Sequence, residues 1–187
     1  QRHNVDFCLT HFEGTAAIMA GTLGRLSGNA GVSVSIKGPG LANMIPGMTA
    51  CYFESLPVVA VTESYLPNTP HSKAHKRLDH KLLTAGVVKG SRFLSSHGPG
   101  FHEMADWSET EIPGPVHFDI SGTPIESDSP IIAERDKGKE GFDTRGFFEL
   151  VSSSKRPVVI AGTLAIRSGW SEWLNKLSIP VFSVAAA

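Results

Sequence analysis

Short apolar segments alternate with longer helical ones along most of the sequence, and this alternation limits the fold more than any other feature. The first third of the chain reads as a strand at 5–9, a helix at 13–26, a strand at 32–36, a helix at 41–53 and a strand at 57–62. Because the connections are short, a parallel sheet covered on both faces is favoured over an antiparallel sandwich. We therefore predict an α/β fold of three αβα layers with a mostly parallel sheet.

The rest of the chain completes this first domain and begins a second one after a linker. Residues 66–80 have little periodicity and predict a long loop, before a strand at 87–94, a helix at 100–110 and a strand at 115–120. A polar stretch rich in charge has the composition of a linker. The alternation then restarts with helices at 144–153 and 169–177 and strands at 158–161 and 180–183. We predict a first domain over 1–122, a linker over 123–145 and the start of a second α/β domain over 146–187.

Two features suggest that the sequence is part of a longer protein. The first residue is Gln1 rather than methionine, and two strands do not complete a second domain. We expect either a fragment or the ordered part of a longer enzyme.

Composition narrows the classes of partner. The formal net charge is −1, so no overall field attracts nucleic acid or an anionic membrane. The longest apolar runs are far shorter than the roughly 18 residues of a membrane span. Cys8 and Cys51 each lie in an apolar segment, which predicts buried free thiols in a reducing compartment. We predict a cytoplasmic protein that binds a small molecule at a local site, with no nucleic acid and no membrane as partner.

Two motifs are expected at one edge of the sheet, where parallel α/β proteins bind ligands. Glu13 begins the first helix, and Gly38, Pro39 and Gly40 connect a strand to the next helix. The glycines let the backbone approach a flat ligand, and the proline adds a rigid apolar surface without an N–H group. Alone, each motif has an ordinary explanation: an acid that favours a helix start, and a strand-to-helix turn. Phosphate binding at the helix start is a third alternative, although the sequence has neither a Walker pattern nor a complete G-x-G-x-x-G.

Taken together, the motifs resemble the pyrimidine-binding domain of thiamine-diphosphate enzymes, most closely the group of acetolactate synthases and 2-oxoacid decarboxylases. The resemblance is carried, in order, by an acid motif at 10–13, an alanine-rich run at 16–21, small residues at 27–28 and 31–32, Gly38-Pro39-Gly40 with Asn43, and Ser55-Leu56-Pro57. Residues 114–120 look like the last strand of that domain, and 156–162 like the opening of the family's central domain. The likeness covers about residues 5–183.

The resemblance implies roles for individual residues. Glu13 would be the catalytic residue, hydrogen-bonding the pyrimidine ring of the cofactor and so activating it. Gly38, Pro39, Gly40 and Asn43 would bind the cofactor, with Pro39 packed on the pyrimidine.

Two positions depart from the family pattern. Phe12 stands where the group usually has His, and Lys76 stands where acetolactate-synthase-like members usually have Gln. These changes leave the substrate in doubt rather than the cofactor. Lys76 could receive a substrate carboxylate, or could be a solvated loop residue. His75 is the second candidate substrate residue, since a loop histidine could transfer a proton to the substrate or be solvated.

No metal site is predicted. The histidines of the loop, His71, His75 and His80, match no zinc spacing and are expected in solvent. The family's motif for diphosphate and Mg²⁺, G-D-G followed by Asn, does not occur in the sequence, so the ligands of Mg²⁺ are expected outside this chain.

The implied enzyme acts on a 2-oxoacid by decarboxylation or acyl transfer, as a lyase or transferase, and this chain alone is expected to be inactive. Its cofactor would be thiamine diphosphate with Mg²⁺, and FAD is left open. The cofactor would lie at a subunit interface, which implies a homodimer or homotetramer. Two rivals remain: a catalytically silent relative with the same fold, and a nucleotide-binding module that uses the helix starts at Gly40 and Gly162.

Overall fold

A computed structural model describes residues 6–66, 68–94, 100–121, 144–163, 165 and 168–184. The chain divides into two compact units, Gln1–Ser127 and Asp128–Ala187. Each unit is described by itself.

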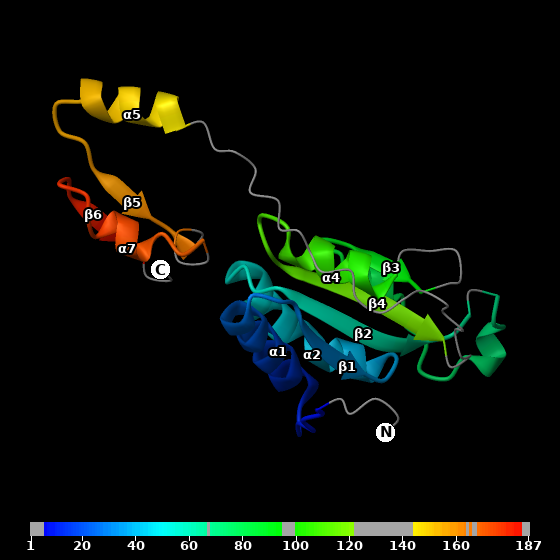
Figure 1. Ribbon diagram of the computed structural model, residues 1–187. Helices are drawn as coiled ribbons and strands as arrows, with labels where there is room; N and C mark the ends of the chain where they lie inside the picture. Colours follow the sequence, from blue (N-terminus) through cyan, green and yellow to red (C-terminus); the bar gives the residue numbers. More distant parts are fainter. Residues whose placement is uncertain are drawn as a thin grey trace. The chain divides into compact units, whose positions relative to one another are not determined.

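The N-terminal unit is built on four parallel strands (Figure 1). These are β1 (Gly31–Ser35), β2 (Val58–Ser64), β3 (Ser91–Phe93) and β4 (Pro115–Ser121), in the spatial order β1-β2-β4-β3. The central pair, β2 and β4, is in register from Val58 opposite Pro115 to Ser64 opposite Ser121. Residues 58–62 of β2 are all buried, as expected for a strand covered on both faces.

Helices cover the two faces of this sheet. The helices α1 (Glu13–Ser27) and α2 (Pro39–Phe53) lie on one face, and α4 (Phe101–Glu109) lies on the other. Ala60 of β2 belongs to a core cluster with residues of α1 and α2, whereas its neighbours Val59 and Val61 belong to a cluster with Met104 of α4. Successive side chains of a strand point to opposite faces, so two separate cores form. The predicted αβα architecture is confirmed.

Glycines let α1 and α2 approach closely. A Cβ atom at Gly47 of α2 would collide with the carbonyl oxygen of Gly14 in α1. The absence of side chains here allows the first turn of α1 to lie against α2.

A long connection leads from β2 to β3. It contains a 3₁₀ turn, η1 (His71–Lys73), which lies inside the loop predicted at 66–80. The short helix α3 (His80–Thr84) begins at the last residue of that predicted loop. The strand expected at 87–94 is only β3, because Val87 and Val88 instead form a turn whose side chains pack against the core of α1 and α2.

The strand expected at 5–9 is wrong for the residues described. Residues 6–10 join no ladder, and the side chains of Phe7 and Leu9 are 77% and 85% exposed. Cys8 is exposed rather than buried, while Cys51 is buried as predicted, and both thiols are free. A short apolar run forms a strand only where a neighbouring strand can pair with its backbone groups. None of the described strands lies beside residues 6–10.

The C-terminal unit is small. Its described residues include α5 (Thr144–Ser153), β5 (Val159–Ala161), α7 (Ser171–Leu174) and β6 (Val181–Ser183), with β5 and β6 parallel. The helix expected at 169–177 is limited to α7. The predicted linker 123–145 lies outside the described residues except for its last two, which begin α5. Among the described helices, none has the length and apolar character needed to cross a membrane.

Candidate functional site

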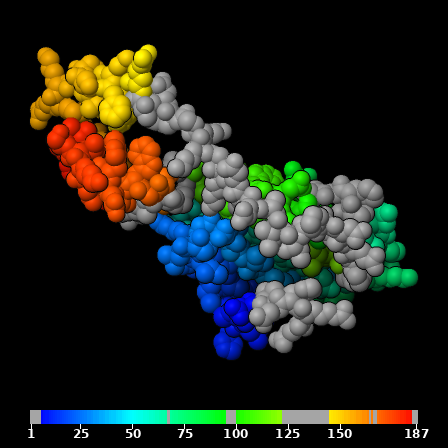
Figure 2. All heavy atoms as spheres, in the orientation of Figure 1, coloured from blue at the N-terminus to red at the C-terminus, as the bar shows by residue number. Residues whose placement is uncertain are grey.

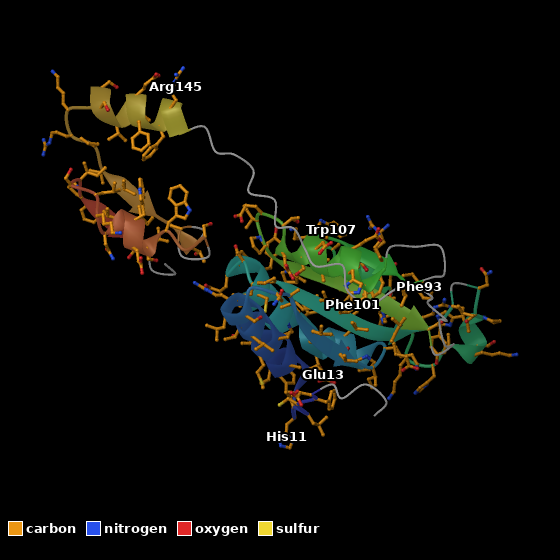
Figure 3. All side chains as sticks on the ribbon, in the orientation of Figure 1. His11, Glu13, Phe93, Phe101, Trp107 and Arg145 are labelled. Atoms are coloured by element: carbon orange, nitrogen blue, oxygen red, sulfur yellow. The ribbon has the colours of Figure 1, made fainter. Side chains whose placement is uncertain are left out.

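Glu13 is the first residue of α1. The preceding Phe12 has an extended backbone, with φ −145° and ψ 132°, and its side chain does not cap the helix. Glu13 is a half-buried residue in the first turn of α1, where the helix dipole stabilises a negative charge. Figure 3 shows it at the N-terminal end of α1.

The turn between β1 and α2 requires glycine at Gly38. Its φ is 64° and its ψ −107°, a conformation that side chains rarely adopt. A Cβ atom there would also overlap the carbonyl oxygen of Lys76. Pro39 follows as the first residue of α2, a position that suits its fixed φ and missing N–H group.

The turn and the acid meet although 25 or more residues separate them in the sequence. A Cβ atom at Gly40 would lie 3.6 Å from Glu13 Oε1 and 2.8 Å from Cγ1 of Ile36. One helical turn further, Asn43 Nδ2 donates a hydrogen bond to Glu13 Oε2 at 3.3 Å. The structure therefore brings Glu13, Gly40 and Asn43 together, with Gly38 and Pro39 in the same turn.

This arrangement fits the pyrimidine end of a thiamine cofactor. Within the described residues, the Glu13 carboxylate accepts a hydrogen bond only through Oε2, so Oε1 can accept one from a ring N–H group. The lack of a side chain at Gly40 keeps the space beside Oε1 open.

A charge pair lies at the same edge of the sheet. Lys37 Nζ is 2.6 Å from Glu63 Oε1 and lies over the ring of Tyr65, 5.0 Å from its centroid. The hydroxyl of Tyr65 donates to the carbonyl of His75 at 3.1 Å. These contacts neutralise Lys37 and tie the loop after β2 to the end of the strand.

The proposed substrate residues lie on that loop. The side chains of His75 and Lys76 are exposed, and Lys76 has a positive φ of 60°. The main chain of Lys76 reaches the Gly38–Gly40 turn, since its carbonyl oxygen faces Gly38. His71 is exposed as well, as expected.

His80 contradicts the expectation of a solvated loop histidine, because it is only 6% exposed. Its Nε2 accepts the N–H of Gly38 at 3.1 Å, and its Nδ1 lies 2.6 Å from Asp119 Oδ1. Asp79 starts α3 by accepting the N–H of Leu82 at 2.9 Å, and the helix then carries His80 into the protein. Asp is a favoured N-cap residue, so Asp79 before the leucines at 82 and 83 is a sequence signal that could have predicted α3, although not the burial of His80.

A second buried histidine belongs to the same group. His117 of β4 contacts Ser91 Oγ through Nδ1 at 2.8 Å and Thr62 Oγ1 through Nε2 at 3.1 Å. Burial lowers the pKa of His117 to about 4, although the nearby Asp119 carboxylate opposes the shift. His117 is therefore neutral at physiological pH.

His80, His117 and Asp119 place potential metal-ligand atoms within 4.8 Å of one another. Each ring nitrogen, however, already has a protein group at hydrogen-bond distance. A metal would have to displace those contacts, so we describe the three residues as a hydrogen-bond network.

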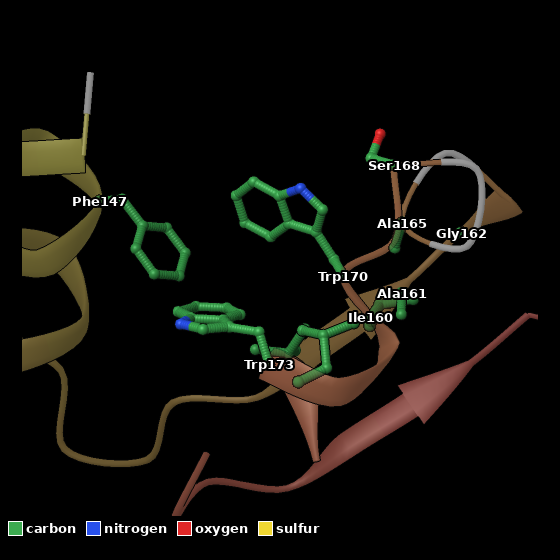
Figure 4. A pocket seen from close by; sticks show the side chains of 10 residues that line it. Phe147, Ile160, Ala161, Gly162, Ala165, Ser168, Trp170 and Trp173 are labelled. Carbon is green, nitrogen blue, oxygen red and sulfur yellow. The ribbon is translucent and has the colours of Figure 1, made fainter. Parts of the chain in front are cut away.

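The C-terminal unit has a pocket of its own, of about 450 Å³ (Figure 4). Phe147, Trp170 and Trp173 form much of its wall, with ring centroids 5.3 Å apart for the two tryptophans and 6.3 Å apart for Phe147 and Trp173. Gly162 also lines it, and Ser168 supplies the one hydroxyl group among the lining residues. Such a wall suits a flat apolar group rather than a phosphate.

Comparisons with known proteins bear on the family of the chain. Residues 1–82 match the family model described as "Thiamine pyrophosphate enzyme, N-terminal TPP binding domain". The "Probable acetolactate synthase large subunit" of Methanocaldococcus jannaschii is 30% identical over 91% of this chain. The chain is acetolactate-synthase-like. The family expected from the motifs is thereby confirmed.

Two further comparisons extend this result. The "Probable 2-ketoarginine decarboxylase AruI" of Pseudomonas aeruginosa is 26% identical over 95% of this chain. The crystal structure of "a putative thiamin diphosphate-dependent enzyme" from Mycobacterium smegmatis matches with a TM-score of 0.82 and 17% identity over 98% of this chain, which supports the fold. The chain spans only 31% and 34% of the two curated relatives and 38% of the solved structure.

Proposed function

We propose that the full-length protein is a thiamine-diphosphate-dependent lyase or transferase that acts on a 2-oxoacid, and that this chain supplies the pyrimidine half of the cofactor site. The observation that carries the proposal is the meeting of Glu13, Gly40 and Asn43 at one edge of a parallel sheet. The relatives bear the names of an acetolactate synthase and a 2-ketoarginine decarboxylase, which favours decarboxylation or acyl transfer.

Bound thiamine diphosphate would supply the chemistry that stabilises negative charge next to a carbonyl group. The residues of this chain would orient and activate it. Glu13 Oε1 would accept a hydrogen bond from the pyrimidine and hold a proton there, while Asn43 fixes the other carboxylate oxygen. Pro39 would pack against the ring, and Gly38 and Gly40 would let the backbone come close.

His75 and Lys76 are the proposed substrate contacts. Their support is positional: the loop that carries them abuts the cofactor turn at Gly38 and is tied to β2 by Tyr65. An ammonium group near this edge would suit the carboxylate of a 2-oxoacid.

The proposal extends to domains, localisation and partners. We propose a pyrimidine-binding domain over 1–122, a linker over 123–145 and the start of a central domain over 146–187, in a cytoplasmic protein. A homodimer or homotetramer would place the diphosphate- and Mg²⁺-binding residues of a partner subunit at the cofactor. Figure 2 shows part of α1 at the surface. Four of its apolar side chains are exposed, which favours coverage by a further protein surface: Ile18, Met19, Leu23 and Leu26.

FAD is a secondary extension of the proposal. The pocket of the C-terminal unit has three aromatic rings that could stack on a flat ring system, but its lining offers no cation for a phosphate. Flavin absorbance of the purified full-length protein tests this extension separately.

The main experiment is a calorimetric titration of the full-length protein with thiamine diphosphate and Mg²⁺, followed by a turnover assay with pyruvate. We expect binding and turnover that both disappear when the cofactor is removed. Binding without turnover on any 2-oxoacid would identify a catalytically silent relative. A protein that binds FAD or NAD but no thiamine diphosphate would be a nucleotide-binding module and would refute the proposal.

A further inference from the structure

We infer that His80 is a positioning residue that holds the Gly38–Gly40 turn in the shape required for the cofactor. The inference rests on the proposed function for the role of that turn. It starts from a contact between two segments 42 residues apart, the hydrogen bond from the Gly38 N–H to His80 Nε2.

The hydrogen bonds of His80 define the state of its ring. Because Nε2 accepts the Gly38 N–H, it carries no proton, and the neutral ring must then carry its proton on Nδ1. That proton points to the Asp119 carboxylate, whose Oδ1 is 2.6 Å away. Asp119 thereby fixes both the orientation of the ring and the tautomer that can receive the Gly38 N–H.

The surrounding groups keep this arrangement in place. His117 packs edge-on against His80, with ring centroids 5.9 Å apart, and its Nε2 is 3.7 Å from Asp119 Oδ1. The hydroxyl of Thr84 donates to the carbonyl of His80 at 2.8 Å. Both histidines are buried, so water does not compete readily for their contacts.

The position of the turn matters for the atoms at the site. Gly38 has a backbone conformation of high energy for most residues, and its buried N–H group needs an acceptor. Two residues later Gly40 lies against Glu13, and five residues later Asn43 binds the same carboxylate. A turn released from His80 would shift the start of α2 and change the alignment of these groups with a bound pyrimidine.

His80 is not a free base, because both ring nitrogens are already in contact with protein groups. Its effect is therefore exerted through Gly38. The same residue ends the loop that carries His75 and Lys76, so one buried side chain anchors the cofactor turn and the substrate loop together.

Two substitutions separate the contacts of His80. The amide of an asparagine ends where Nδ1 lies and can still reach Asp119, whereas the amide of a glutamine ends where Nε2 lies and can still accept the Gly38 N–H. In the full-length protein, we expect His80→Asn to weaken thiamine-diphosphate binding by about tenfold or more, as for loss of a hydrogen bond to a buried group. His80→Gln should stay within about threefold of the parent protein.

A readout without cofactor accompanies the titration. Hydrogen exchange at the Gly38 amide should be faster in His80→Asn than in His80→Gln by about tenfold or more. As a control, Ser108→Ala removes a buried hydrogen bond to the Gly114 carbonyl in the layer of α4. It should lower stability without changing either the dissociation constant or the exchange at Gly38.

The outcomes distinguish this inference from the proposed function. Equal dissociation constants for the two His80 variants, or weaker binding by His80→Gln, would overturn the positioning role. A control variant that weakens binding as much as His80→Asn would reduce the effect to general stability and overturn it as well. If the parent protein binds no thiamine diphosphate, the proposed function fails, and the exchange rates at Gly38 still decide whether His80 holds the turn.

Discussion

Replacing Gly38 by alanine tests whether the turn at the site depends on glycine. The backbone conformation at Gly38 costs most residues about 1–3 kcal/mol, and displacing the Lys76 carbonyl from the added methyl group adds a similar amount. Reduced freedom of the unfolded chain offsets about 0.4–1 kcal/mol of this. We expect Gly38→Ala to lower the free energy of unfolding by about 2–4 kcal/mol in urea denaturation.

Gly86→Ala is the matched control. Gly86 has no neighbouring atom within 4 Å of a built Cβ and is not among the glycines with positive φ. The same substitution should therefore change the free energy of unfolding there by less than about 1 kcal/mol. If the two variants unfold at the same urea concentration, the strain and the overlap at Gly38 are not present in solution.

Three further predictions concern single groups. The pKa of His117 is near 6.5 in the unfolded chain and about 4 in the folded protein, so the unfolded chain takes up the proton first as the pH falls. The free energy of unfolding should therefore fall by up to about 3 kcal/mol from pH 6.5 to pH 4, and by less in His117→Gln. Equal dependence of this free energy on pH in the two proteins would refute the prediction. Burial raises the pKa of Cys51 to about 11, so a thiol reagent at pH 8 should modify Cys8 alone in the folded protein and both after denaturation; two rapid modifications would contradict it. Lys76→Gln should raise the Michaelis constant for the 2-oxoacid and leave cofactor affinity unchanged. Unchanged kinetics would show that Lys76 is a solvated residue without a substrate contact.

The sequence predicts much of this fold because most of its signals are local. Periodicity and helix punctuation locate α1 and α2 closely, and the apolar run at 57–62 locates β2. The apolar run near Phe7 carries the same kind of signal but has no partner strand among the described residues. Pairing is a long-range property, which periodicity cannot report.

The site shows the same limit. Glu13 and the Gly38–Gly40 turn could be predicted because each begins a helix at the carboxyl edge of the sheet. His80 could not be placed by spacing, since its burial depends on Asp119 in a strand 39 residues away. A histidine in a polar loop resembles a solvated one until the strand that receives it is known.

The central claim is that Glu13 activates a thiamine cofactor. Glu13→Gln keeps the size of the side chain and a hydrogen-bonding amide but removes the carboxylate. In the full-length protein, the most direct measurement is the exchange rate of the cofactor's thiazolium proton, together with turnover of a 2-oxoacid. We expect both to fall by about 10²- to 10⁴-fold, as for a positioned proton-transfer group, while stability changes by about 1 kcal/mol at most. A Glu13→Gln protein that binds the cofactor and exchanges this proton at the parent rate would show that Glu13 only begins a helix.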